Sequence, residues 1–141
     1  MKILLSCISF GGLTGSELYY YELSRALVNR GNKVTVISDF KGSTILSDKA
    51  EKDGVRCIQG RHVGGMHCNN DELPDQSEFD VVCFSHGPVF SDMLQLTYDS
   101  LPKLMVCHSE VLDMEEPIKH CSIKHYIGIR PAICSKIVEK D

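Results

Sequence analysis

The fold of this chain is decided by residues 2–17, which read KILLSCISFGGLTGSE. Lys2 to Ser9 form a short apolar run typical of a strand, and the glycine-rich turn from Phe10 to Gly15 follows it. A helix begins near Ser16, because Thr14 and Glu17 have the spacing of a capping box. A strand, a glycine turn and a capped helix in this order predict a nucleotide-type α/β fold.

The helix that starts near Ser16 is amphipathic. Its pattern predicts that five residues lie together on one face of the helix. It also predicts that the helix ends at Gly31, because glycine is common at helix C-termini. The face consists of Tyr19, Tyr20, Leu23, Ala26 and Leu27.

The glycine turn is a candidate ligand site. Glycine lets a ligand approach the main chain, and unpaired N–H groups at a helix start attract anions such as diphosphate. Phe10 stands where the dinucleotide fingerprint requires its first glycine, and Gly15 is followed by Ser16 rather than by the lysine of a P-loop. Neither motif is therefore present, and a tight strand-to-helix connection without a ligand stays open as the alternative.

Length and charge restrict the class of protein. The chain has 141 residues, enough for one domain with a real core, and a net charge of -4 without a Lys/Arg run. This balance favours neither a nucleic-acid nor an anionic-membrane partner. The run after Met1-Lys2 is too short and polar for a signal peptide, and no apolar run approaches the ~20 residues that cross a bilayer.

The cysteines predict a reducing compartment. There are seven, an odd number, and none are spaced Cys-x-x-Cys. Cys7, Cys83 and Cys107 lie in apolar runs, where cysteine behaves as a small buried side chain, so we expect a cytoplasmic protein. Adjacent residues rarely face one ion, so we expect no metal at the neighbouring pairs His67-Cys68, Cys107-His108 and His120-Cys121.

Five further strands follow along the chain. The β-branched and apolar runs predict them at residues 32–38, 54–58, 79–84, 103–107 and 125–129. Helices are expected at about 43–52 and 89–98 and from Pro131, and a long loop at 61–77. The alternation predicts a single doubly wound, Rossmann-like α/β domain over residues 1–141, with a mostly parallel sheet in the order 3-2-1-4-5-6 and helices on both faces.

Ligands of such sheets bind at the carboxyl ends of the strands. The turn at Gly11-Gly12 follows the first strand, His86 follows the fourth, and His108 with Glu110 follows the fifth. These strands are neighbours in the expected order, and a histidine there can exchange hydrogen bonds with a ligand hydroxyl. A histidine that caps a helix or binds a backbone carbonyl is the alternative for each one alone.

No acidic residue is assigned as a catalytic base. Glu110, Glu115 and Glu116 follow the fifth strand, and a solvated acidic loop explains them equally well. Glu17 is interpreted as the reciprocal partner in the helix cap.

Four segments together resemble the N-terminal domain of GT-B glycosyltransferases of the retaining family 4 type. They are GGLTGSE at 11–17, YELSRALVNRG with KVTVIS at 21–38, FDVVCFSHGP at 79–88 and PKLMVCHSE at 102–110. The resemblance covers nearly the whole chain. It implies an acceptor-side domain whose glycine loop, here Gly11, Gly12 and Gly15, lies near the diphosphate and sugar of a nucleotide-sugar donor.

The same resemblance implies roles for the strand-end residues. His108 takes the position that contacts the donor sugar, and we expect it to be the catalytic histidine, while His86 matches a family position that lines the cleft. From its place after the fifth strand, Glu110 is expected to join His86 in substrate or donor binding. The nucleotide sugar is a co-substrate, and no separate cofactor is implied. The family's donor-binding second lobe has no counterpart in residues 1–141, so we expect this chain to need a second domain or subunit.

Two other functions stay open. A nicotinamide-dependent oxidoreductase is favoured by Asp39, which ends the second strand near the place of a ribose-binding acid. It is disfavoured by Phe10 and by the lack of a Tyr-x-x-x-Lys pair. A non-catalytic binding or assembly module could use an exposed apolar cleft as a protein interface.

Overall fold

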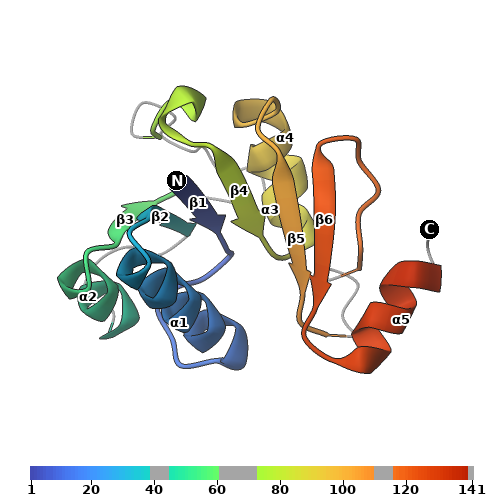
Figure 1. Ribbon diagram of the computed structural model, residues 1–141, viewed down its shortest axis with the longest axis horizontal. Coiled ribbons are helices and arrows are strands. Elements are labelled where there is room, and N and C mark those ends of the chain that lie inside the picture. The colour runs from blue at the N-terminus through green and yellow to red at the C-terminus, as the bar shows by residue number, and fades with distance from the viewer. Residues whose placement is uncertain (39–44, 61–72, 110–115, 140–141) are drawn as a thin grey trace.

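A computed structural model describes residues 1–38, 45–60, 73–109 and 116–139 of the chain. Six strands form one sheet in the order β3-β2-β1-β4-β5-β6, and every pairing between neighbours is parallel (Figure 1). The expected α/β class and strand order are confirmed. The strands are β1 (Lys2–Ser6), β2 (Lys33–Ser38), β3 (Arg56–Gln59), β4 (Val81–Phe84), β5 (Lys103–Cys107) and β6 (Ile123–Gly128).

The central strands are apolar on both sides because helices cover both faces of the sheet. Ile3 and Leu5 of β1 belong to a core cluster with Tyr20, whereas Leu4 between them belongs to a second cluster with Phe90. Helices α1 (Gly15–Asn29) and α2 (Ile45–Lys52) contribute to the first cluster. The second receives residues from α3 (Gly87–Val89), the π-helical turn η3 (Phe90–Leu94) and α5 (Pro131–Glu139), while α4 (Gln95–Thr97) continues η3 without adding a residue to it.

Helix α1 packs most of its predicted apolar face on the core: Tyr20 is buried, and Tyr19, Leu23 and Leu27 lie against the same cluster. Glu17, Tyr20 and Ser24 are its buried residues, while Ala26 is exposed and Leu27 half-buried. The prediction for Ala26 is wrong because two polar side chains take core positions: the Ser24 hydroxyl donates to the carbonyl of Tyr21, and Glu17 is enclosed by the turn before the helix. The helix ends as expected, with Gly31 at φ +79°.

Several element boundaries differ from the sequence expectation. Strand β1 ends at Ser6, three residues before Ser9, so that the turn is longer than expected. The expected third strand begins at Arg56 rather than Gly54, because Gly54 adopts φ +89° directly after α2. The helix expected at 89–98 begins at Gly87 and contains a π-helical turn. Of the expected loop at 61–77, residues 61–72 lie outside the described part, and Gln76–Glu78 form the 3-10 turn η2.

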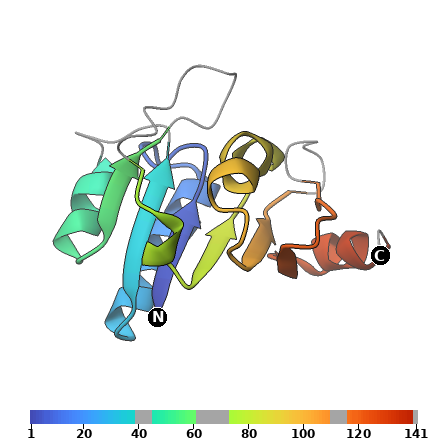
Figure 2. The same cartoon turned by 90° about the horizontal axis from the view of Figure 1, so that it is seen from above.

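The register brings the ends of three strands to one edge of the sheet. Ser6, the last residue of β1, pairs with Phe84 of β4, which in turn pairs with Met105 of β5. Seen from above, the strands follow one another from β3 to β5, with α5 beyond them (Figure 2). The residues that follow β1, β4 and β5 therefore share an edge, as a doubly wound sheet requires of its binding site. Among the described residues, no helix is both long and apolar enough to span a membrane.

Candidate functional site

The glycine turn is closed around a carboxylate of the chain itself. Glu17 Oε1 accepts from the backbone N–H groups of Gly11 and Gly12 at 3.0 and 2.8 Å, and its Oε2 accepts from the N–H of Thr14 at 3.1 Å. The hydroxyls of Ser9 and Thr14 also donate to it, at 2.6 and 2.8 Å. These three N–H groups of the turn are therefore paired within the chain, and the capping role expected of Glu17 is confirmed.

This carboxylate is buried and stays ionised. Burial raises the pKa of Glu17, but the hydrogen bonds from Ser9, Gly12 and Thr14 outweigh that effect and lower the pKa from 4.5 to about 2. The side chain is only 4% exposed. A Cβ at Gly12 would lie 2.6 Å from Glu17 Oε2, so the turn needs glycine there because the carboxylate approaches the backbone closely.

His86 follows β4 in a backbone conformation that residues with a side chain rarely adopt. Its φ is +77°, in the region that favours glycine, and it is the only described residue other than glycine with a positive φ. It precedes α3, is buried, and its Nδ1 lies 3.3 Å from the Ser85 hydroxyl. Such backbone strain costs about 1–3 kcal/mol and persists where the surroundings hold the residue in place.

His108 follows β5 and lies within a group of rings. Its ring is edge-on to Tyr19 at 4.9 Å between centroids, tilted to Tyr20 at 6.0 Å, and nearly parallel to His86 at 6.5 Å. Its Nε2 is buried and has no hydrogen-bond partner among the described residues. Burial, and next the charge of His86, lower the pKa of His108 to about 4, so the imidazole is neutral at pH 7.

A cavity of about 290 Å³ joins the turn to the end of β4. It is lined by Cys7, Ile8, Ser9, Thr14, Ser16, Glu17 and His86. Since His108 lies beside His86, the arrangement brings the glycine turn and both histidines to one edge of the sheet. The cavity wall combines hydroxyl groups with one imidazole, a set suited to hydrogen bonds with a polar ligand.

Of the other residues expected at the site, the structure describes Gly15. Gly15 is the first residue of α1 and has open space around the position of a Cβ. Glu110 and Asp39 lie outside the described residues. Sequence reasoning missed Ser9 as a residue of the turn, because it was expected in the strand. The capping-box spacing identified Glu17, but nothing in the sequence showed that its carboxylate also reaches Gly11 and Gly12.

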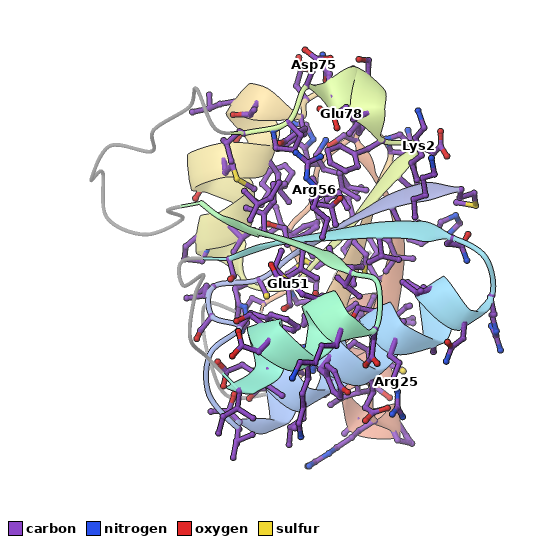
Figure 3. The ribbon with its side chains drawn as sticks, turned by 90° about the vertical axis from the view of Figure 1, so that its left-hand side faces the viewer. Lys2, Arg25, Glu51, Arg56, Asp75 and Glu78 are labelled. Carbon is purple, nitrogen blue, oxygen red and sulfur yellow. The ribbon has the colours of Figure 1, made fainter. Side chains whose placement is uncertain are left out.

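A second cavity, of about 440 Å³, lies at the opposite edge of the sheet, at the amino ends of β1 and β2. Lys2, Arg56 and Glu78 are among its lining residues, and Figure 3 shows Arg56 and Glu78 near one another. Arg56 Nη1 lies 3.0 Å from Glu78 Oε2, so the charges at this cavity are partly paired. Parallel sheets bind ligands at the carboxyl ends of their strands, so the candidate site remains the first cavity.

Within the described ranges, no group of three or more His, Cys, Asp or Glu side chains could hold a metal ion. The candidate site is therefore built from hydroxyls, imidazoles and one enclosed carboxylate.

The fold and this site define a Rossmann-like domain with a polar cavity at the carboxyl ends of its central strands. A comparison with protein-family models finds no match, and a comparison with curated protein sequences finds none either. Three solved structures are similar in part.

The first similar structure is MurG of Acinetobacter baumannii, with a TM-score of 0.45 and 14% identity over 74% of this chain and 34% of that one. The second is CalG4, the calicheamicin glycosyltransferase, with a TM-score of 0.46 and 13% identity over 99% of this chain and 41% of that one. The third is the glycotransferase of kitacinnamycin, with a TM-score of 0.40 and 16% identity over 74% and 29%. The chain thus spans less than half the length of each.

Proposed function

We propose that this chain is the acceptor-side domain of a glycosyltransferase that uses a nucleotide-sugar donor. The observation that carries the proposal is the meeting of the glycine turn, His86 and His108 at the ends of three neighbouring strands. These are the residues that the resemblance to GT-B enzymes of the retaining family 4 type marks as lining the cleft.

His108 is the residue proposed to contact the donor sugar. Its Nε2 has no hydrogen-bond partner among the described residues and is buried, so a sugar hydroxyl, which both donates and accepts, pairs with it only after a side-chain movement that exposes the atom. Because its pKa is about 4, His108 is neutral at pH 7 and does not supply a proton as a general acid. Its role is to hold and orient the sugar, and the flanking ring of Tyr19 restricts the movement of the imidazole.

Stabilisation of the departing nucleotide diphosphate is assigned to a second lobe. Transfer with retention depends on that stabilisation and on the exclusion of water as two lobes close. In the glycine turn the N–H groups of Gly11, Gly12 and Thr14 already bind Glu17, so the turn offers few donors to phosphate. Transfer by the isolated, monomeric domain would contradict this part of the proposal.

The closed turn disfavours the oxidoreductase alternative. A dinucleotide-binding turn places its backbone N–H groups against the pyrophosphate, and it needs glycine where this chain has Phe10. The Phe10 side chain is 1% exposed and belongs to the core. The turn therefore offers few free N–H donors and has a core phenylalanine where a dinucleotide-binding turn requires glycine.

The compartment proposed for this domain is the cytoplasm. No disulfide joins the cysteines in the described part of the chain, and Cys83 lies buried in the core, where burial raises its thiol pKa to about 12. A protonated, enclosed thiol of this kind is a packing residue.

A thermal-shift titration tests the proposal. Purified chain is heated with UDP-sugars, GDP-sugars or NADH, and the melting temperature is followed. A ligand at ten times its dissociation constant adds about 1.4 kcal/mol of stability, a shift of roughly 4 °C for a domain of this size. We expect nucleotide sugars to raise the melting temperature and NADH to leave it unchanged.

Matched variants locate the effect. His108→Ala should abolish the shift, whereas His125→Ala, at an exposed position on β6, should keep it. Stabilisation by NADH alone would overturn the proposal, and so would a nucleotide-sugar shift that His108→Ala leaves intact.

A further inference from the structure

The direction of the hydrogen bonds decides what the cavity beside the glycine turn can bind. Ser9 and Thr14 each have one hydroxyl proton, and both protons point to the ionised carboxylate of Glu17. Ser16 Oγ lies 3.4 Å from Thr14 Oγ1, and because the Thr14 proton is engaged, Ser16 is the donor of that contact. Ser9 and Thr14 therefore have no proton left for a ligand. Ser9 and Ser16 retain lone pairs, whereas Thr14 Oγ1 already accepts from the backbone N–H of Glu17 and from Ser16.

The carboxylate itself is saturated. Five donors converge on the two oxygens of Glu17, which offer about four lone-pair directions. Three of these donors are backbone N–H groups of the turn, the groups that would otherwise bind a phosphate. An incoming anion would find no free donor at Gly11, Gly12 or Thr14, and it would meet a buried negative charge.

We propose that Glu17 is the specificity-determining residue of this cavity: it admits neutral ligands that donate hydrogen bonds through hydroxyl groups, such as a sugar ring, and it excludes phosphate. The sugar half of this inference rests on the proposed function. The exclusion of phosphate rests on the hydrogen bonds of the turn alone, so the two halves can fail separately.

In this proposal the residues that line the cavity have separate roles in ligand binding. Ser9 and Ser16 accept from ligand hydroxyls on the side of the turn. His86, which is buried, also lines the cavity. A nucleotide-sugar donor would then place its sugar in this cavity and its diphosphate outside, against groups that are not part of the turn.

Amide NMR of the whole chain tests the inference. The ¹⁵N-labelled protein is titrated at constant ionic strength with sodium pyrophosphate, and separately with the methyl glycosides of glucose, galactose, mannose and N-acetylglucosamine. We expect at least one glycoside to shift the amides of Ser9, Ser16 and His86 in a saturable manner. Pyrophosphate should leave the amides of Gly11 and Gly12 unshifted.

The two halves have different refutations. Saturable shifts of the Gly11 and Gly12 amides with pyrophosphate in the unmodified chain would overturn the role of Glu17 and leave the proposed glycosyltransferase function standing. Absence of any shift at the cavity with all four glycosides would overturn the sugar half, and with it the support that this cavity gives to the proposed function.

Variants separate specificity from folding. Glu17→Gln removes the negative charge, and we expect pyrophosphate then to shift the amides of Gly11 and Gly12, whereas Glu22→Gln on the exposed face of α1 should behave like the unmodified chain. Should Glu17→Gln not fold, Ser9→Ala keeps the carboxylate and removes one acceptor. It should weaken glycoside binding about fivefold, the effect of one hydrogen bond, without any gain in pyrophosphate binding. Glycoside binding unchanged in Ser9→Ala would contradict the inference.

Discussion

Replacing Glu17 with glutamine should cost a large part of the stability of this domain, and the cost should depend on pH. The ionised carboxylate accepts five hydrogen bonds, two of them from the glycines of the turn. Glutamine keeps one acceptor oxygen and replaces the other with an NH₂ group, which is itself a donor. At least two donors of the turn therefore lose their partner in Glu17→Gln.

The pKa of Glu17 gives the magnitude. Its fall from 4.5 to about 2 corresponds to about 3 kcal/mol, since each pKa unit is worth about 1.4 kcal/mol. A folded-state pKa below the unfolded one gives stability that is complete above pH 4.5 and is lost as the pH falls toward 2. Glutamine resembles the protonated acid, so the difference in unfolding free energy between the two proteins should be about 3 kcal/mol at pH 7 and should shrink between pH 4.5 and 2.

Urea denaturation followed by far-ultraviolet circular dichroism at several pH values measures this difference. The contribution of His108 is present in both proteins and cancels in the comparison. Glu22→Gln is the matched control, because Glu22 lies on the same helix, is exposed and pairs only with Arg25; we expect it to change stability by less than about 0.5 kcal/mol. Curves for Glu17→Gln and the unmodified chain that stay parallel from pH 7 to pH 3 would refute the reasoning.

Three further predictions concern other residues. In thermal melts, Gly12→Ala should destabilise the domain by about 1–3 kcal/mol, because its Cβ would meet a hydrogen-bonded carboxylate oxygen at 2.6 Å. Gly15→Ala is the control: it has open space and a helical position, so it should be neutral or stabilising by up to about 1 kcal/mol. Lys103→Met should cost about 2–4 kcal/mol in urea denaturation, because the buried ammonium donates to three backbone carbonyls; Lys124→Met, which removes a single exposed bond, should cost under about 1 kcal/mol. The imidazole of His108 should titrate near pH 4 by NMR. Because the folded-state pKa lies below 6.5, the contribution of His108 to the free energy of unfolding should be complete above pH 6.5 and be lost as the pH falls toward 4. Titration near pH 6.5 would contradict the burial of this imidazole.

The sequence predicted the scaffold well because each part of it has a local cause. The glycine turn and the capping box placed α1, and the β-branched and apolar runs placed the strands. The alternation of strands and helices then left few topologies, so the order 3-2-1-4-5-6 followed from chain connectivity. That order also places the residues after β1, β4 and β5 at one edge, and the rings of His86 and His108 lie there with their centroids 6.5 Å apart.

The features that the sequence did not predict depend on tertiary contacts, which no local pattern describes. The apolar pattern of α1 predicts that Ala26 is buried, but Ala26 is exposed, and two polar residues of the helix, Glu17 and Ser24, are buried instead. At the end of β4 a glycine follows His86, yet the positive φ belongs to the histidine. The turn donors pair with Glu17 across five and six residues, a distance that no local spacing rule covers.

The most direct test of the account is an NMR titration of the imidazoles of His86 and His108 with nucleotide sugars and with the corresponding nucleoside diphosphates. If the cavity holds a sugar and not a phosphate, at least one of UDP-glucose, UDP-N-acetylglucosamine and GDP-mannose should shift both rings, while UDP and GDP should shift neither. Equal shifts from the nucleoside diphosphates, or no shift from any nucleotide sugar, would contradict it.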